Sequence, residues 1–461
     1  MAGDTLGDRG AAGRVQGGGA CAGPTPGGGC LTGLRPVAAA DLGTMSDPLP
    51  PRSDDTRPRS YRDASEFDDF DRTQDEINLV QTRRVVEIDM EVHSVQTPRT
   101  PDAGIEIRGR LRRPSHEVFG GWREAFGRMK LLPFLVPDRV AALPGAVLLR
   151  LVAAPPGPKP GNPTINLVLF ILTILTTFFV GSLYSPDVRA TGMTDLLNPA
   201  NLIQGWPFAL TLLAILGIHE LGHFFAARHY GIPVSLPYFL PVPFAFGTLG
   251  AFIRLRGPID DRRKLFDVGV AGPLAGLAVA VPLLFVGLQT SELTTISGQV
   301  MLEGNSLLYW GAKYLVFNEW LPDFATGLDV HVGPMAMAAW IGLLATGLNL
   351  LPVGNLDGGH VVFSLFGGHA RYFFRGTLLL LAVLGIAGFA PLQAYLPALE
   401  YIGYTGWLVW LWLIILVMGP SHAVTLDMVT ELDGRRRWIG YAVLLVFVLT
   451  FVPVPLRAFV F

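Results

Sequence analysis

The five residues from His219 to His223 read His-Glu-Leu-Gly-His, a combination that suits metal-dependent hydrolysis. Positions four apart on a helix share one face, so His219 and His223 can both point at one metal ion. Glu220 lies one step around the helix, where it can reach a water on the metal rather than the metal itself. This is the HExxH pattern, in which two histidines bind zinc and the glutamate is the general base.

The segment that carries this pattern is predicted to cross a membrane. A spanning helix needs about 20 mostly apolar residues, and the run from Trp206 to Ala227 supplies them. Ionisable side chains at that depth are costly and therefore indicate a functional site. The alternative is a pair of histidines packed on a helix face, and the complete pattern in an apolar segment argues against it.

A catalytic zinc needs a third protein ligand and one open position for water. Among the predicted spans and their ends, Asp357 is the best choice. It lies in a segment broken by Gly and Pro, and irregular backbone at membrane depth is tolerated where it lines a cavity. His360 and His369 are weaker alternatives, and Asp357 could also be an ordinary carboxylate at a helix end.

A second motif lies in a later apolar segment, where Asn349, Pro352, Leu356, Asp357 and Gly358 form an N-x-x-P-x-x-x-L-D-G pattern. Together with the His-Glu-Leu-Gly-His segment, it resembles the site-2 protease family of intramembrane zinc metalloproteases. The resemblance extends from residue 164 to the C-terminus and includes the Gly-Pro-Leu-Ala-Gly segment at 272–276. The part before residue 164 looks like that of the bacterial and chloroplast branch, and the loops are too short for a PDZ domain.

The resemblance implies specific roles for the residues of both motifs. It assigns one zinc ion to His219, His223 and Asp357, the role of catalytic base to Glu220, and substrate positioning or oxyanion stabilisation to Asn349. It implies an endopeptidase of regulated intramembrane proteolysis that cuts single-span membrane proteins already trimmed on their outer side. The alternative is a non-proteolytic metal-binding transporter or receptor, which has no need for a base beside a ligand.

The fold class that we predict is a polytopic α-helical membrane protein with about seven spans, preceded by a small soluble α+β domain. Half of the residues (50%) are hydrophobic, and they concentrate after residue 160. We expect a disordered N-terminal region at 1–83, the soluble domain at 84–154 and the transmembrane metalloprotease domain at 164–461. Cys21 and Cys30 both lie in the Gly-rich N-terminal tract, which excludes a disulfide framework and a cysteine-bound metal.

Hydrophobic periodicity predicts the individual elements. In the soluble domain we expect strands at 86–92, 105–111, 131–136 and 146–152 and a helix at 115–129. The predicted spans are 164–184, 206–230, 266–288, 334–351, 377–396, 401–418 and 438–459. The Pro- and Gly-rich stretch at 233–255 follows the metal-binding helix. We expect it to be a re-entrant, extended segment that either pairs with an unwound substrate or only packs the site.

The loops differ in charge, which predicts the orientation of the helices. Basic residues gather in the loops near 254–264, 371–375 and 435–437, whereas the opposite loops offer only Arg189 and Lys313. We therefore expect the basic loops and the N-terminus on the cytoplasmic side of a bacterial cell membrane. The formal net charge of −2 gives no indication of nucleic-acid binding.

Overall fold

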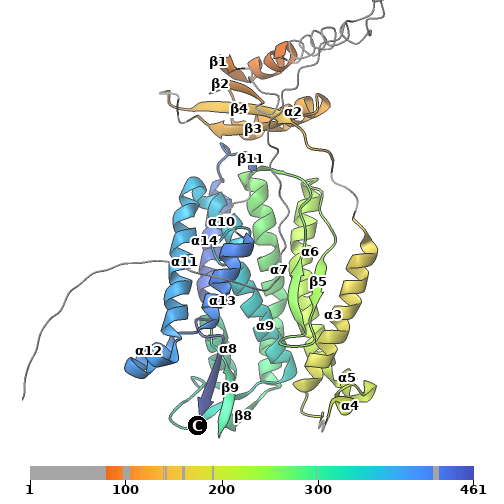
Figure 1. Ribbon diagram of the computed structural model, residues 1–461, viewed down its shortest axis with the longest axis vertical. Coiled ribbons are helices and arrows are strands. Elements are labelled where there is room, and N and C mark those ends of the chain that lie inside the picture. The colour runs from red at the N-terminus through yellow and green to blue at the C-terminus, as the bar shows by residue number, and fades with distance from the viewer. Residues whose placement is uncertain are drawn as a thin grey trace, which may run out of the picture. The chain divides into compact units, whose positions relative to one another are not determined.

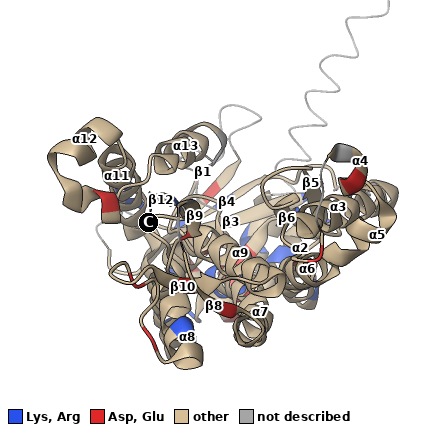
Figure 2. Cartoon of the chain, turned by 90° about the horizontal axis from the view of Figure 1, so that it is seen from below, with Lys and Arg blue, Asp and Glu red and all other residues tan. Residues whose placement is uncertain are grey.

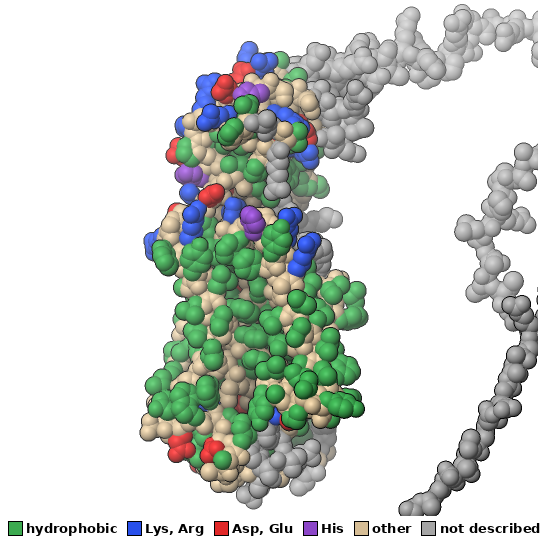
Figure 3. All heavy atoms as spheres, turned by 90° about the vertical axis from the view of Figure 1, so that its left-hand side faces the viewer, with side chains coloured by type: hydrophobic (Ala, Val, Ile, Leu, Met, Phe, Trp, Pro, Cys, Tyr) green, Lys and Arg blue, Asp and Glu red, His purple; other side chains and the backbone are tan. Residues whose placement is uncertain are grey.

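The computed structural model describes residues 79–96, 104–138, 140, 143–157, 161–188, 192–296, 298–418 and 425–460. Within these residues, four helical segments are long and apolar enough to cross a membrane: Pro163–Leu183, Pro199–His229, Arg262–Gln289 and Asp357–Ala387. Figure 3 shows one face of the helical part, where hydrophobic side chains form a broad belt with Lys and Arg at one end of it. The chain is therefore a membrane protein.

Eight helices account for most of the helical part. They are α3 (Pro163–Leu183), α6 (Trp206–His229), α7 (Arg262–Gln289), α9 (Pro334–Asn349), α10 (Asp357–Phe366), α11 (Ala370–Ala387), α13 (Gly406–Leu413) and α14 (Gly434–Thr450). Short helices α4 (Met193–Leu196), α5 (Pro199–Leu202), α8 (Leu307–Phe317) and α12 (Ala390–Tyr395) connect them. Helices α7, α11 and α14 all begin at the same end of the helical part. We call it the basic end, because Arg262, Arg371 and Arg435 lie there.

Helices α6 and α7 pack closely side by side, and α9 contacts both of them (Figure 1). Small residues allow this approach. A Cβ atom added at Gly222 of α6 would lie 2.5 Å from the carbonyl oxygen of Ala271 in α7. Farther along these helices, Leu212 and Ile215 of α6 and Trp340 of α9 are buried in the largest apolar core among the described residues.

The stretch after α6 forms an antiparallel hairpin of β5 (Tyr238–Pro241) and β6 (Thr248–Phe252), in which Phe239 pairs with Ala251. Helix α3 holds the β5 side of this hairpin. The Nδ2 atom of Asn166 donates to the carbonyl oxygens of Leu236 and Pro237, each at 2.9 Å. The expected extended segment is therefore present, with β6 as the strand farther from this anchor.

The part before α3 is a sheet covered by a helix. Strands β1 (Met90–Gln96), β2 (Ile105–Leu111), β4 (Ala146–Ala153) and β3 (Leu131–Pro137) are antiparallel neighbours in this order, and α2 (Ser115–Arg128) joins β2 to β3. The helix buries Phe119, Trp122 and Phe126 against apolar residues of the strands, including Leu149. This burial follows the 3.6-residue periodicity of the α2 sequence.

Two short strands from the helical part extend this sheet. Strand β11 (Thr425–Asp427) pairs in parallel with β3, and β7 (Ile259–Asp261) pairs in parallel with β11. Asp427 is fully buried and accepts hydrogen bonds from the backbone N–H groups of Val429 and Thr430. The last residue of β7, Asp261, caps α7 by accepting from the N–H groups of Arg263 and Lys264. The sheet is thus continuous with the start of α7.

Several bounds differ from the sequence-based expectations. The strand expected at 86–92 is wrong in position, because a helix runs from 79 to 87 and β1 begins only at Met90. The span expected at 377–396 lies earlier, within Asp357–Ala387, and α14 ends at Thr450, before β12 (Leu456–Val460). Pro453 and Pro455 lack the backbone N–H that would continue α14. Residues 1–78, most of the expected disordered region, lie outside the described residues.

The end opposite the basic end contains two further strand pairs, β8 (Glu292–Thr295) with β10 (Leu328–His331) and β9 (Gln299–Glu303) with β12. Figure 2 views the chain from this end and shows that uncharged residues make up most of the helices. Lys313 of α8 is fully buried here, with its Nζ atom 2.9 Å from Glu303 and 3.2 Å from Asp329. Burial raises the pKa of Asp329, and the nearby Lys313 ammonium opposes this shift.

Candidate active site

His219 and His223 of α6 meet Asp357, the first residue of α10, inside the helical part. The Oδ2 atom of Asp357 lies 3.2 Å from the Nε2 atom of each histidine. The two Nε2 atoms are themselves 3.2 Å apart. Three potential ligand atoms therefore surround one point. Among the described residues, His219, His223 and Asp357 form the group of side chains that is placed to hold a metal ion.

The orientation of His223 is fixed from the side of α7. Its Nδ1 atom lies 2.7 Å from the backbone carbonyl oxygen of Val268. A carbonyl oxygen only accepts, so Nδ1 carries the proton and Nε2 keeps its lone pair for a metal. The Nδ2 atom of Asn349, at the end of α9, lies 3.4 Å from the Nε2 atom of His219. Elements α6, α7, α9 and α10 thus all contribute to the position of the two imidazole rings.

Two glycines of α7 make room for the imidazole rings. A Cβ atom at Gly272 would lie 2.0 Å from the Nε2 atom of His223, and one at Gly276 would lie 3.2 Å from the Cβ atom of His219. A side chain at position 272 would occupy the space of the histidine. The Gly-Pro-Leu-Ala-Gly segment, which the sequence analysis includes only as part of the family resemblance, therefore shapes the site itself.

Glu220 lies beside the three potential ligands. It is 5% exposed, so it is screened from bulk solvent. The backbone N–H of Ile253, just after β6, faces its carboxylate. Glu220 also borders two cavities that meet at Ala251 of β6. A polar cavity of about 190 Å³ contains the metal-binding group, and an apolar cavity of about 220 Å³ lies next to it, with Phe246, Leu344 and Trp410 in its wall.

The other residues considered from the sequence have different surroundings. His360 lies one helical turn after Asp357 and lines the polar cavity, but it is outside the group of three converging ligand atoms. His369 lies in the short turn between α10 and α11, near the ring of Tyr372. The structure therefore brings together His219, Glu220, His223, Asn349 and Asp357.

Sequence reasoning missed two contributors to the site. The first is the carbonyl group of Val268, because a backbone acceptor leaves no signal in the residue type. The second is the ion pair between Arg436 of α14 and Asp267, which also accepts from the hydroxyl of Tyr230. This network ties the start of α14 to the first turns of α7, next to Val268. The charge of Asp267 at the start of an apolar segment was the available signal.

Comparison with known proteins finds a family model that matches the part of the chain around the site. Residues 207–384, which include all five of the residues brought together here, match the model of peptidase family M50. The match begins at the start of α6 and ends within α11. It therefore covers both motifs and the Gly-Pro-Leu-Ala-Gly segment between them.

The curated relatives that the chain matches include plant proteins. It is 35% identical over 260 residues to "Probable zinc metalloprotease EGY1, chloroplastic" of Oryza sativa subsp. japonica, covering 52% of this chain and 44% of the relative. It is 31% identical over 326 residues to the Arabidopsis thaliana protein of the same name, covering 67% of this chain and 56% of the relative. The chain thus spans about half of the length of these relatives.

These relatives correct the expected location. The prediction of a bacterial cell membrane is wrong, because the relatives are named chloroplastic and point to a chloroplast membrane. The physical reason for the error is that basic loops orient helices across a membrane and carry no information about which membrane it is. The basic end remains a feature of the chain, without the cytoplasmic assignment.

Proposed function

We propose that this chain, which carries a peptidase family M50 domain at residues 207–384, is an intramembrane zinc metalloendopeptidase. Its substrates would be membrane proteins, cut in or near their membrane-spanning segments. The observation that carries the proposal is the convergence of His219, His223 and Asp357, with Glu220 beside them, within segments apolar enough to span a membrane. The relatives named as probable zinc metalloproteases support the same chemistry.

The three side chains fit a zinc ion. Zinc binds His nitrogen and carboxylate oxygen at about 2.0 to 2.2 Å in tetrahedral sites, which separates neighbouring ligand atoms by about 3.3 Å. The three ligand atoms here are 3.2 Å apart in each pair. The proton on Nδ1 of His223 leaves the Nε2 atom free to bind. We therefore assign His219, His223 and Asp357 as zinc ligands, with room for a water in the polar cavity.

Glu220 is the proposed general base. Bound zinc supplies Lewis acidity toward water and toward a peptide carbonyl. The Glu220 carboxylate accepts a proton from the attacking water and delivers it to the amine that leaves when the peptide C–N bond breaks. Burial keeps other water away from this carboxylate, which the N–H of Ile253 faces. The alternative function was a metal-binding transporter or receptor. Such a protein has no evident use for a base such as Glu220 directly after a metal ligand.

Asn349 is the proposed hydrogen-bond donor to the substrate. It lies on the wall shared by the polar and apolar cavities, next to His219. Its amide can donate to the oxygen on which negative charge develops when the scissile carbonyl is attacked. A donor that is already in position costs little reorganisation during the reaction. This role for Asn349 agrees with the one that the family resemblance implies.

Strand β6 is the proposed docking edge for the substrate. A helix hides its carbonyl groups in hydrogen bonds, so the substrate must unwind before it is cut. Strand β5 is anchored to α3, and β6 runs between the two cavities. An unwound substrate could add to the outer edge of β6 as a further strand. Its scissile bond would then lie close to Glu220.

We also propose that the chain crosses the membrane seven times. Four segments have the required length, and the shorter helices α9, α13 and α14 would complete the count. Helix α9 can be short because it lies in the core against α6 and α7 instead of facing lipid along its length. The domain boundaries at residues 83 and 154 remain part of the same proposal, with the sheet before α3 outside the membrane.

The decisive experiment compares the wild type with Glu220→Gln after reconstitution in lipid vesicles with a single-span model substrate. The amide keeps the size of the side chain but cannot accept the proton from water. We expect turnover to fall by about 10² to 10⁴-fold, with zinc content, measured by mass spectrometry, near one ion per chain in both proteins. Full turnover in the variant would exclude the proposed mechanism. Absence of cleavage by the wild type, together with movement of zinc across the vesicle, would favour the transporter.

A further inference from the structure

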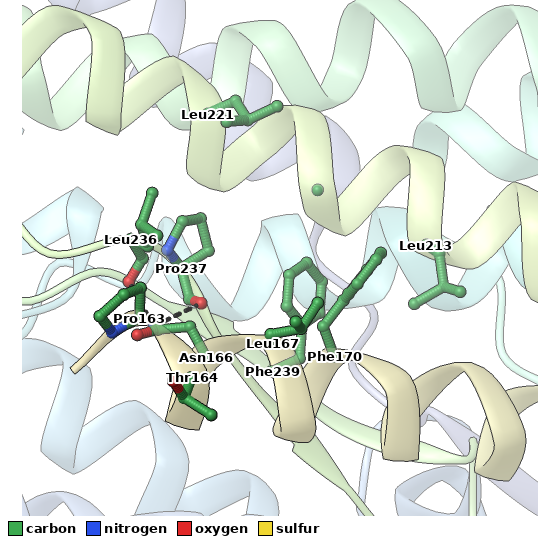
Figure 4. Close-up of a pocket in the computed structure, with 11 residues that line it drawn as sticks. Pro163, Thr164, Asn166, Leu167, Phe170, Leu213, Leu221, Leu236, Pro237 and Phe239 are labelled. Carbon is green, nitrogen blue, oxygen red and sulfur yellow. Dashed lines mark hydrogen bonds between the residues drawn. The ribbon is translucent and has the colours of Figure 1, made fainter.

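A cavity of about 550 Å³ that the active site does not use lies between α3 and α6. Figure 4 shows side chains of both helices and of the β5 segment around it. Helix α6 contributes Leu213, Gly217 and Leu221, which are spaced by four and share one face. At 100° per residue, this face is nearly opposite the one that carries His219 and His223. The cavity is therefore separate from the metal site, and we call it the α3–α6 groove.

The walls of the α3–α6 groove are almost entirely apolar. Its lining residues are Pro163, Thr164, Asn166, Leu167, Phe170, Leu213, Gly217, Leu221, Leu236, Pro237 and Phe239. The amide of Asn166 is turned to the backbone of the β5 segment, where it donates two hydrogen bonds. Leu167 is 57% exposed at the open side, in a segment apolar enough to span a membrane. An opening of this kind gives access to lipid chains.

One end of the groove meets a second cavity that is basic. This cavity, of about 540 Å³, shares Leu236 with the groove and is lined by Arg228 of α6. The Arg228 side chain is exposed and lies over the ring of Phe224, with its Cζ atom 5.6 Å from the ring centre. Among the described residues that line either cavity, none is acidic. Arg256 adds positive charge nearby, because its guanidinium lies against Gly161, just before α3.

The two cavities follow the depth profile of a membrane. Pro163 is the first residue of α3, and Arg228 is the next-to-last residue of α6, so both lie at the ends of potential spans. From this level the groove continues along α3 to Phe170, about 10 Å deeper at 1.5 Å per residue. The charged part is at the interface, and the apolar part is at the depth of lipid chains. Basic cavities between spanning helices bind anionic lipid headgroups.

We propose that the α3–α6 groove and the adjoining Arg228 cavity bind one membrane lipid with an anionic headgroup. An acyl chain lies against Leu167, Gly217 and Phe239, and the headgroup phosphate or sulfate pairs with Arg228. The groove extends over only about a third of a span of about 30 Å, which suits a lipid chain better than a substrate helix. At Gly217, an added Cβ atom would meet only the Cζ atom of Phe239, at 3.9 Å, so the wall is open there.

This position connects the lipid to the metal site through one pair of residues. Phe239 forms part of the groove wall and pairs across the hairpin with Ala251. Ala251 borders the polar and the apolar cavity of the active site, next to Glu220. A bound acyl chain would therefore support the β5–β6 hairpin from behind. Lipid binding does not depend on the proteolytic activity proposed above, so it is tested by binding alone.

The experiment is native mass spectrometry of the purified full chain after incubation with equal amounts of phosphatidylglycerol and phosphatidylcholine in detergent. We expect one retained lipid per chain, with about a fivefold preference for phosphatidylglycerol. Arg228→Gln should abolish the preference, whereas Arg435→Gln, an exposed arginine elsewhere at the basic end, should keep it. Retention of both lipids in equal amounts by the wild type would overturn the assignment of an anionic headgroup.

Two variants test the apolar part without relying on Arg228. Gly217→Leu fills the groove from α6, and Leu167→Trp fills it from α3. Both should lose the retained lipid while their zinc content, which reports an intact fold around α6, stays at the wild-type level. Unchanged lipid retention in both would overturn the proposal. A photoreactive phenylalanine derivative at position 167 should attach to lipid, and its attachment to a substrate polypeptide would identify the groove as a protein-binding site instead.

Discussion

The Nδ1 atom of His223 lies 2.7 Å from the carbonyl oxygen of Val268, so helix α7 sets the tautomer of a proposed zinc ligand that lies on α6. Val268 is in the second turn of α7, and α7 begins directly after β7, the edge strand of the sheet that is built mainly from residues before α3. A shift of the sheet against the membrane helices would therefore move the hydrogen-bond acceptor of His223. This gives the sheet a physical connection to the site.

The first prediction concerns the space between α6 and α7. Gly272→Ala would place a methyl group 2.0 Å from the Nε2 atom of His223, so the ring or the helix must move. Disturbing the support of a zinc ligand typically lowers metal affinity or activity by about 10 to 100-fold. We expect the zinc affinity of Gly272→Ala, measured by competition with a chelator, to fall by about 10 to 100-fold. Gly311→Ala in α8, where no atom lies within 4 Å, is the control and should bind zinc like the wild type.

The second prediction concerns the third ligand. Asp357→Ala removes the carboxylate whose Oδ2 atom lies 3.2 Å from both histidine Nε2 atoms. We expect zinc content and proteolytic turnover to fall together, because a site with two protein ligands holds zinc weakly. Metal analysis of the purified variant gives the answer. Full zinc occupancy would show that another group is the ligand, and His360, in the same cavity, would be examined next.

The third prediction concerns the orientation of the helices. Single cysteines in place of the exposed residues Arg435, at the basic end, and Glu292, in β8, should react with a membrane-impermeant reagent from opposite faces of sealed vesicles. Both native cysteines are replaced by serine for this measurement. Reaction of both positions from the same face would contradict the seven-span proposal.

The fourth prediction concerns the substrate. His219, Glu220 and His223 are all less than 10% exposed, so a bulky folded domain cannot approach them. We expect a single-span substrate with a large folded outer domain to resist cleavage until that domain is removed. The comparison uses one substrate that contains an engineered protease site, before and after trimming. Equal rates for both forms would mean that access is not limited by the size of the outer domain.

Much of the site could be predicted from the sequence because its chemistry is local. The spacing of His219 and His223 fixes a common helix face, and the scarcity of carboxylates at membrane depth left Asp357 as the best remaining ligand. The role of Gly272 was not predictable in this way, because a glycine indicates close approach without naming the neighbour. The backbone acceptor at Val268 was even less accessible, since every residue type has a carbonyl group.

In the fold, too, elements with a local sequence pattern could be predicted, whereas pairings between distant segments could not. The helix at 115–128 and the strand at 105–111 were evident from periodicity, since each buries one face against its own neighbours. The pairing of β3 with β11 joins Leu135 to Asp427, nearly three hundred positions apart, and three-residue strands carry no periodic pattern. The helix at 79–87 overlaps the end of the region expected to be disordered and the start of the strand expected at 86–92, because the alternation at 86–92 crosses the boundary between two elements.

The last prediction concerns the edge of β6 that borders the site. The backbone N–H of Ile253 faces the carboxylate of Glu220 and therefore points toward the metal-binding group. N–H groups two residues apart along a strand point the same way, so the N–H of Ala251 also faces the cavities and is available to a substrate strand.

Proline at position 251 would remove that donor, whereas serine would keep it. A backbone hydrogen bond contributes about 0.5 to 1.5 kcal/mol, which corresponds to about a two- to tenfold loss in kcat/KM for Ala251→Pro. Ala251→Ser should stay close to the wild type, and both variants should retain zinc and accumulate normally, because Ala251 contributes no ligand. Turnover of a reconstituted substrate measures the effect. If Ala251→Pro cleaves as fast as Ala251→Ser, the substrate does not pair with β6, and the hairpin only packs against the site.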